Sequence, residues 1–385
     1  MAEAALKINL SPSQLTYEAE GKQKLILDSA DRLNLQRYLL EGMTLPINNQ
    51  ALKAAFFLTD GMLTDFQDLL KAFQSIQGHC SVFYNGAYTK SISLASSIIE
   101  FNTSAKYYLG GISKIADDYN HGRVTVEYAE ESVTALINIL LKQFAGFIKD
   151  CDEVCAGINR FLTETYQDNV TMNGQDGKSG LNKVYTDKYN LNDSEIKKLR
   201  DDLDEAKRQL DKASEDYNYN VTVAATTPTY AWIFPFGTIP AAVVAGVYGD
   251  RATAAYKKMG ELRDKIAKSS ADLNQKMGMT AGLSIASSQV QKLSELIKKA
   301  IAPIEQMKGT WIAMSDDLGA LNKTVKEDIT QLPMVVKNIG VDKALEQWDA
   351  IAKEAQDYRQ RAFITETSKN LAQSNVISFP ELKKA

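Results

Sequence analysis

Few residues in this chain of 385 amino acids are of the types that carry catalysis. The two histidines, His79 and His121, lie far apart in the sequence, in segments that we interpret as loops. No HExxH or similar metal-binding spacing, no GxSxG motif and no CxxC pair is present. Acidic pairs such as Asp201 with Asp202 fit the solvated faces of helices. We therefore expect no catalytic residue, no bound metal and no cofactor.

The segment TMNGQDGKSG, residues 171–180, contains the tripeptide GKS of phosphate-binding P-loops. A P-loop requires a glycine five residues before the glycine of that tripeptide, within a loop that follows a strand. Met172 occupies that position, and no strand is predicted before it. We interpret the segment as a flexible loop.

The three cysteines cannot all pair with one another, so a disulfide framework is not expected. Cys151 and Cys155 lie one helical turn apart. Free cysteines on a helix are usually small buried apolar residues, and we prefer that interpretation to a metal site.

The sequence favours contact with a lipid bilayer over catalysis, phosphate binding or metal binding. Residues 217–249 contain no charged side chain, although charged residues make up 24% of the chain. Exposed apolar surface costs roughly 25 cal/mol per Å², so this segment must be buried in protein or in lipid. Its aromatic rings suit the bilayer interface, at the level of the headgroups. The predicted membrane contacts are Tyr230, Trp232, Ile233, Phe234, Phe236, Ile239, Val243 and Val244.

The uncharged segment is too short for two ordinary transmembrane helices. Divided into two legs, it gives about sixteen residues each, or roughly 25 Å of helix, whereas a bilayer core is about 30 Å thick. Pro228, Pro235 and Pro240 shorten any regular element and argue against one spanning helix. A short hairpin that dips into a membrane, or is stored against the protein, fits better. A tip buried permanently in a core or a dimer contact is the alternative.

Apolar residues alternate at spacings of three and four on both sides of this segment, as in a left-handed coiled coil. The remaining positions of both flanks are heavily charged and therefore solvated. We predict a long antiparallel hairpin, with residues 193–216 as its ascending leg, 217–249 as its apolar head and 250–300 as its descending leg. The apolar positions are Ile196, Leu199, Leu203, Ala206, Leu210, Ala213 and Tyr217, then Ala255, Met259, Leu262, Ile266 and Leu273.

Almost continuous helical periodicity and only eight prolines predict an all-α fold, an elongated multi-helix bundle whose two body parts are residues 1–192 and 301–385. Residues 1 to about 20 are poorly specified. We expect loops at 77–88 and around Pro333, a turn at 120–122 and a loose C-terminal tail. The expected helices cover about 22–42, 48–76, 89–119, 124–168, 303–330 and 341–372, with Pro303 starting a new one.

Two kinds of local signal support these elements. Asn48 or Asn49 can cap the helix that follows, and Asn192 with Glu195 resembles a capping box at the start of the ascending leg. Trp311 and Trp348 lie on amphipathic stripes, which predicts that both pack in a core.

Charge and the N-terminal residues limit the partners and the location. The net charge is −4, with basic and acidic residues interleaved, so no electrostatic footprint for nucleic acid is present. The first residues, MAEAALKINLSPSQL, lack the basic and apolar regions of a Sec signal peptide. We expect a secreted protein that leaves its cell by another route.

A multi-helix bundle whose coiled-coil hairpin has an uncharged tip resembles the cytolysin A superfamily of α-helical pore-forming toxins. The chain looks most like the A component of the xenorhabdolysin-type binary cytotoxins and the related all-helical insecticidal crystal toxins. Each matching segment is a helix pattern with a few preferred residues, and their order and separation also match. They are RYLLEGMTLPINNQAL (37–52), YAWIFPFGTIPAAVVAGVYG (230–249), GTWIAMSDDLGAL (309–321) and LEQWDAIAKEAQDY (345–358).

The resemblance implies a soluble protein, monomeric in solution, that attaches to a target-cell membrane and assembles with a B-type partner into a ring-shaped lytic pore. In that family the A component is associated with attachment and with support of the partner, which does most of the spanning. The three prolines depart from some relatives and put a straight helical insertion in doubt. Two other interpretations remain open: a self-sufficient single-component pore former, and a coiled-coil protein whose tip binds another protein.

Overall fold

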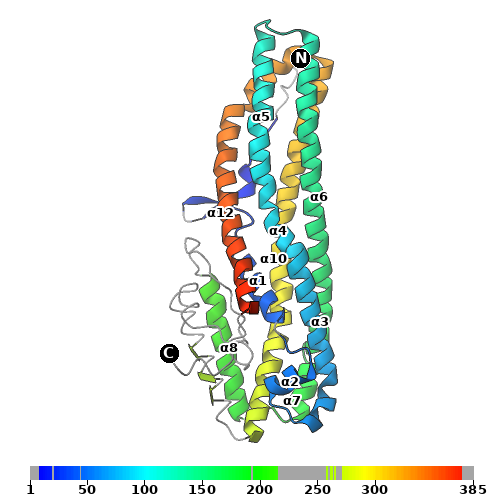
Figure 1. Ribbon diagram of the computed structural model, residues 1–385, viewed down its shortest axis with the longest axis vertical. Helices are drawn as coiled ribbons and strands as arrows, with labels where there is room; N and C mark the ends of the chain where they lie inside the picture. The colour runs from blue at the N-terminus through cyan, green and yellow to red at the C-terminus, as the bar shows by residue number, and fades with distance from the viewer. Residues whose placement is uncertain are drawn as a thin grey trace. The chain divides into compact units, whose positions relative to one another are not determined.

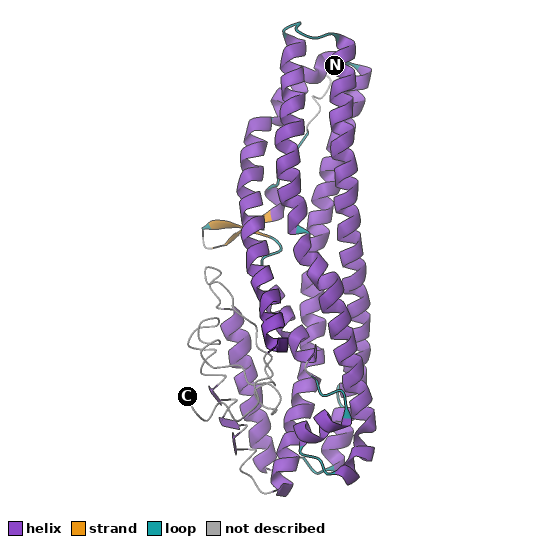
Figure 2. Cartoon of the chain, viewed as in Figure 1, coloured by secondary structure: helices purple, strands orange, loops and turns teal. Residues whose placement is uncertain are grey.

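The computed structural model describes residues 8–19, 21–43, 45–191, 194–215, 257–258, 261–262, 264–265 and 271–374. Nearly all of them are helical, and the strands among them form one short antiparallel hairpin (Figure 2). The predicted all-α class is therefore confirmed. The chain divides into two compact units, each built from three separate stretches of sequence.

The first unit comprises Met1–Asp28, Ala87–Ala156 and Ile301–Gln360. A 3₁₀ turn, Ser13–Leu15, leads into strands β1 (Thr16–Ala19) and β2 (Lys22–Leu25), which pair with Thr16 opposite Leu25. A second 3₁₀ turn, Ile329–Gln331, precedes α11. The helices, labelled in Figure 1 where there is room, are α4 (Thr89–Ser93), α5 (Ala95–Asn120), the first part of α6 (Val126–Asn173), the second part of α10 (Ala271–Glu327), α11 (Leu332–Ile339) and most of α12 (Val341–Ser374).

Two tryptophans form the centre of this unit, as predicted. Trp311 of α10 and Trp348 of α12 are both fully buried, and their rings stack at 5.7 Å with 14° between the planes. Phe101 of α5 meets Trp348 edge-on at 4.5 Å, and Phe144 of α6 stacks on Trp311 at 5.7 Å. Aromatic pairs in these geometries contribute about 0.5–1.5 kcal/mol beyond their burial, so this cluster holds four helices together.

The N-terminal segment, which the sequence left poorly specified, is attached to this core. The indole Nε1 of Trp348 donates a hydrogen bond to the carbonyl of Leu10 at 2.7 Å, and the amide of Asn9 donates to Asp317 at 2.8 Å. These contacts hold residues 8–12 against α10 and α12, just before the β-hairpin.

A helix predicted over about 22–42 is wrong in its first third. Lys22–Leu25 form β2, and α1 (Ala30–Met43) begins only afterwards. Gly21 has φ of 71°, a left-handed conformation that costs glycine little and permits a tight turn between the strands. Leu15 and Leu25 are almost fully buried at the base of the hairpin. Burial of these two side chains outweighs the helical pattern of the neighbouring residues.

The second unit comprises Ser29–Gly86, Gly157–Ala300 and Arg361–Ala385. A 3₁₀ helix, Asp60–Phe66, lies between α2 and α3, and a π-helical turn, Tyr84–Tyr88, follows α3. Asn48 caps α2 as predicted, with its side chain accepting the amide of Ala51 at 2.8 Å. The helices are α1, α2 (Asn49–Phe56), α3 (Gln67–Phe83), the second part of α6, α7 (Leu181–Lys188), α8 (Ser194–Glu215) and the first part of α10.

The single helix predicted over 48–76 is interrupted at Phe57. This residue has φ of 53°, in the left-handed region, and ends α2. The reason is tertiary, since the rings of Phe56 and Phe57 lie on two glycines of α10. A Cβ at Gly282 would stand 2.4 Å from the Phe56 ring, and one at Gly278 would stand 2.6 Å from the Phe57 ring. The glycines form a notch in α10 that neither heptad spacing nor composition predicts.

The loop predicted at 77–88 is also wrong, because α3 continues through it and ends in the π turn. The segment contains polar residues and two glycines, Gly78 and Gly86, which are common in loops. Its apolar residues nevertheless lie on one buried face of the helix. Phe83 stacks on Phe161 of α6 at 4.2 Å with nearly parallel planes. A π turn adds a residue to the helical turn and so keeps the next buried positions on that face.

Two further predictions, both based on prolines, are wrong. Pro303 does not start a helix but lies inside α10. A proline inside a helix lacks one backbone hydrogen bond, and its ring clashes with the preceding turn. The helix continues because Ile304 and Met307, which follow the proline, are buried and extend the apolar stripe. Pro333 stands in the first turn of α11, a helix that the sequence analysis took for a connection. The other long helices and the turn at 120–122 are confirmed, with Gly122 at φ of 65°.

Candidate functional site

The predicted membrane contacts cannot be placed. Tyr230, Trp232, Ile233, Phe234, Phe236, Ile239, Val243 and Val244 all lie outside the described residues, and their role stays a prediction. The same holds for Asn192 of the proposed capping box and for the C-terminal tail. The described residues that bear on the site are therefore those that lead into and out of the uncharged segment.

The ascending leg is a helix, as predicted. α8 spans Ser194–Glu215, packs against α1, and buries Ile196 and Leu199 on one face. Its exposed face is charged, with an ion pair between Arg208 and Glu205 at 2.7 Å. The helix thus carries the chain up to the uncharged segment while presenting a solvated outer surface.

Part of the descending leg returns to α8. Residues 257–258, 261–262 and 264–265 are helical, and Leu262 is only 3% exposed. The ammonium of Lys258 lies 3.9 Å from the carboxylate of Asp202 on α8. Residues on either side of the uncharged segment are therefore neighbours, which agrees with the predicted hairpin. The heptad residues Ala213 and Ala255 lie outside the described residues.

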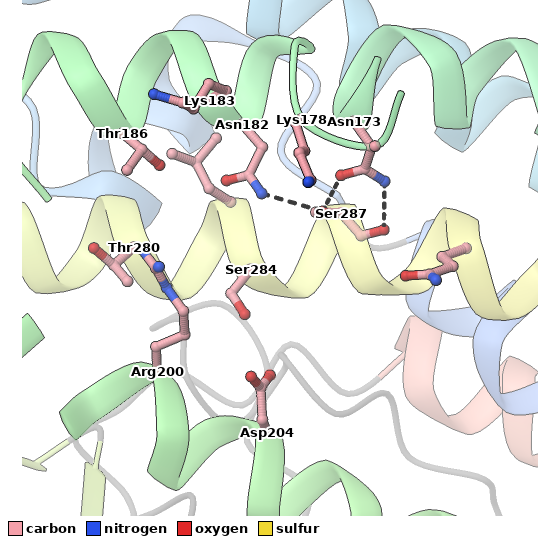
Figure 3. A pocket seen from close by; sticks show the side chains of 13 residues that line it. Asn173, Lys178, Asn182, Lys183, Thr186, Arg200, Asp204, Thr280, Ser284 and Ser287 are labelled. Carbon is pink, nitrogen blue, oxygen red and sulfur yellow. Dashed lines mark hydrogen bonds between the residues drawn. The ribbon is translucent and has the colours of Figure 1, made fainter. Parts of the chain in front are cut away.

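A polar cavity of about 470 Å³ lies beside the base of α8. It is lined by the end of α6, the loop that follows it, and one face each of α7, α8 and α10 (Figure 3). Ser287 of α10 forms hydrogen bonds with the end of α6 and with α7. Its hydroxyl contacts Asn173 and accepts the Asn182 amide at 3.2 Å, and its carbonyl accepts the Asn173 amide at 3.1 Å.

The GKS segment forms one wall of this cavity. The loop predicted over 171–180 is shorter than expected, because residues 171–173 still belong to α6. Residues 174–180 leave the helix and form an internally bonded turn. Asp176 accepts hydrogen bonds from the Lys178 amide and the Ser179 hydroxyl, both at 2.8 Å, and these bonds lower its pKa. A Cβ at Gly180 would stand 2.4 Å from the backbone nitrogen of Asn173. Only glycine therefore allows the loop to approach the end of α6 this closely. No strand precedes the loop, which agrees with the exclusion of a P-loop.

His79, expected in a loop, lies in α3 and contacts a buried carboxylate. Its Nδ1 stands 2.8 Å from Asp168 of α6, which also accepts the Ser75 hydroxyl at 3.0 Å. Asp168 is 6% exposed, and burial raises its pKa although the hydrogen bonds from His79 and Ser75 act in the opposite direction. His79 and Ser75 thus bond α3 to Asp168 of α6.

The cysteines are not activated. Burial raises the pKa of Cys151 to about 12, and it also raises the pKa of Cys80 and of the half-buried Cys155. These thiols therefore stay protonated near neutral pH, as expected for small apolar residues. Within the described ranges, no cluster of three or more histidine, cysteine or acidic side chains is arranged to hold a metal ion.

One described helix, α6, has an 18-residue stretch apolar enough to cross a membrane, with a mean hydropathy of 1.2. The same helix is part of the aromatic core of the first unit. Its buried residues recur at steps of four and three, which is the pattern of a core helix as well as of a span. They are Val133, Ile137, Leu140, Phe144 and Phe147. Composition alone therefore gives only weak evidence for membrane insertion of α6.

Comparison with protein-family models and with curated protein sequences found no match. Several solved structures do match. The Bacillus cereus HblL1 toxin component is 13% identical, with 92% of this chain and 98% of that chain covered and a TM-score of 0.58. Soluble SmhA of the tripartite α-pore forming toxin Smh from Serratia marcescens is 12% identical, with coverage of 93% and 96% and a TM-score of 0.58. Soluble AhlB of the tripartite toxin AHL from Aeromonas hydrophila is 15% identical, with coverage of 86% and 92% and a TM-score of 0.50.

At these identities the likeness is one of fold, and it extends over nearly the whole chain. The predicted resemblance to α-helical pore-forming toxins is confirmed at that level. The finer likeness to the A component of a binary toxin stays a prediction.

The neighbouring positions of Asp202 and Lys258 can be tested by crosslinking. In a Cys155→Ser background, Asp202→Cys with Lys258→Cys should react with a short bismaleimide to give an internal crosslink, located by mass spectrometry. Lys197→Cys with Lys258→Cys is the control, because Lys197 is exposed and lies about 140° around α8 from Asp202. Equal yields from both pairs, or none from the first, would contradict the packing of the two legs.

The buried carboxyl of Asp168 predicts a specific pH dependence. Its raised pKa means that the folded protein binds a proton more tightly than the unfolded chain, so this group contributes less stability as pH rises above 3.8. Asp168→Asn cannot ionise, so its stability relative to the wild type should increase as pH is raised from 4 to 6, above the ordinary carboxyl pKa of 3.8. Urea unfolding at several pH values measures this difference.

Asp176→Asn serves as the control for that series. The pKa of Asp176 is lowered, so its carboxylate contributes stability above the ordinary pKa of 3.8, and the variant should not gain stability relative to the wild type as pH rises. A constant difference for Asp168→Asn would show that burial does not penalise its charge.

Proposed function

We propose that this chain is a soluble component of an α-helical pore-forming toxin, which binds the target membrane through residues 217–249 and assembles with a B-type partner into a lytic pore. The observation that carries the proposal is the uncharged segment inserted between two helical legs, within a fold shared with toxin components. The described helices form an aromatic core from their own side chains, without a contribution from this segment being required. The chain would act outside the cell that makes it, at the membrane of a target cell.

Lipid is the environment that best suits this segment. Leaving tens of apolar residues in water is unfavourable at roughly 25 cal/mol per Å², and Tyr230, Trp232 and Phe234 are residue types that favour the bilayer interface. The charged face of α8, with Glu205 and Arg208, favours water and would remain outside the hydrocarbon. This division of apolar head from charged leg supports attachment by the head.

A partner is proposed because the head is short. About sixteen residues per leg reach roughly 25 Å, less than the 30 Å core of a bilayer. Sliding α8 inward would bring charged residues into hydrocarbon, at about 2.5 to 3.5 kcal/mol for each central charge on insertion scales. Partner subunits that supply the rest of the span remove this cost. SmhA and AhlB are named as components of tripartite toxins, which supports an assembly of several chains.

Two other functions compete with this one. A self-sufficient pore former would insert the same head without a partner, and a coiled-coil interaction protein would bury the head against another protein. The tests below distinguish all three.

Membrane attachment is tested by flotation with liposomes. The wild type should float with lipid, and Phe234→Asp should bind on the order of a hundredfold less, because a charge in hydrocarbon costs about 2.5 to 3.5 kcal/mol. Tyr107→Asp is the matched control, since this tyrosine is 74% exposed on α5 and should not affect flotation. Circular dichroism checks that both variants fold.

Two outcomes would contradict a lipid-binding head. If the wild type stays in the aqueous fraction, the head serves another partner. If Phe234→Asp misfolds while Tyr107→Asp does not, Phe234 belongs to a structural core.

The need for a partner is tested by dye release. The purified chain alone should release little dye from liposomes across a wide concentration range, because its head is too short for two passes. Addition of the protein encoded next to it should increase release. Vigorous release by the chain alone would show a self-sufficient pore former.

A further inference from the structure

The polar cavity beside α8 has a feature that the proposed function does not use: its lining is dominated by hydrogen-bond donors and positive charge. Lys178 from the loop, Lys183 from α7 and Arg200 from α8 are cationic, and Asp204 is the one acidic residue among those that line it. The whole chain, by contrast, has a net charge of −4. A concentration of positive charge in a cavity within an acidic chain favours an anionic ligand.

Among the described residues, two of these cations have no ion pair. Lys183 pairs with Asp187, one turn along α7. In the described part of the chain no carboxylate pairs with Lys178, and Arg200 donates to the carbonyl of Leu191 at 3.3 Å. In Figure 3 Arg200 reaches toward α10 from α8, and Lys178 reaches toward α10 from the loop. The two charges thus face the same helix from different elements.

A third donor in the cavity is buried and unsatisfied. Thr280 of α10 lines the cavity, is 2% exposed, and its hydroxyl has no hydrogen-bond partner among the residues that the structure describes. Leaving a buried hydroxyl unpaired costs roughly 1–3 kcal/mol, so such groups in folded proteins usually have a partner. Ser284, one turn further along α10, adds a second hydroxyl to the same wall.

The start of α7 reinforces this preference. Its N-cap residue, Gly180, provides no side-chain cap, and Asn182 and Lys183 of its first turn line the cavity. The positive end of a helix dipole favours an anion at this point. Ammonium, guanidinium, hydroxyl and amide donors together match the oxygens of a phosphate group, whereas a cation would meet like charge.

We propose that this cavity binds a phosphate group, carried either by a small soluble molecule or by the headgroup of an anionic lipid. Its volume exceeds that of the phosphate alone, so the group enters with the molecule that bears it. Binding joins Arg200 of α8 to Lys178 of the loop and to α10. Occupancy therefore holds the ascending leg against α10. The binding itself does not depend on the proposed membrane role.

Isothermal titration calorimetry with two probes tests the proposal and distinguishes the sources. One probe is inorganic phosphate and the other is monomeric dihexanoyl phosphatidate, both at fixed ionic strength. Lys178→Ala should weaken binding at least tenfold, because it removes an unpaired cation from the cavity, and Asp204→Asn should strengthen it. Lys198→Ala, an exposed lysine of α8 outside the cavity, should bind as the wild type does.

Arg200→Ala is a secondary variant, since Arg200 also bonds to Leu191 and its loss can loosen α8. Binding of inorganic phosphate that depends on Lys178 indicates a soluble ligand, and binding of phosphatidate alone indicates a lipid headgroup. No binding of either probe, or equal losses in Lys178→Ala and Lys198→Ala, overturns the site. Neither probe forms a bilayer, so the result is independent of whether residues 217–249 bind membranes.

Discussion

The body of the first unit depends on one constraint: long helices must bury a narrow apolar stripe that returns every seven residues. On α6 that stripe includes Val133 and Ile137, and on α10 it runs through Ile304, Met307 and Trp311. Trp311 and Trp348 stack on one another within this interface, and Trp348 also bonds the N-terminal segment through the Leu10 carbonyl. Because stripes of this kind fit only one register, the helices cannot slide without exposing an indole.

The second unit also buries apolar side chains between helices, but it does so with irregular backbone elements. Phe56 and Phe57 enter a glycine notch on α10, and a π turn follows the stack of Phe83 on Phe161. Polar groups are placed inside this unit as well, in the His79–Asp168 pair and around the cavity beside α8. Irregular backbone and buried polar groups are costly, and they persist here only because the surrounding helices satisfy most of their hydrogen bonds.

These features are consistent with the proposed function, in which a body folded in water carries a segment that binds lipid. The cores described above are built from other parts of the chain, and α8 has a charged outer face on the side of the sequence that leads to the uncharged residues 217–249. The proposed function requires a protein that folds in water and later contacts lipid, which is easier when apolar surface is confined to one part of the chain. Asp202 and Lys258, one before this part of the chain and one after it, lie 3.9 Å apart. A ligand in the cavity at Arg200 would strengthen the attachment of the same leg.

The sequence by itself determined the helical class, the long helices α5 and α6, the helix of the ascending leg and the buried tryptophans, because these follow from local periodicity. Tertiary structure alone decided where periodicity is broken. Phe57 turns left-handed because Gly278 and Gly282 lie opposite, Pro303 stays helical because the residues beyond it are buried, and Lys22–Leu25 form a strand because Thr16–Ala19 pairs with them. The polar cavity likewise gathers Lys178, Arg200 and Thr280 from segments far apart in the sequence. Such choices depend on contacts between distant residues, which no local pattern contains.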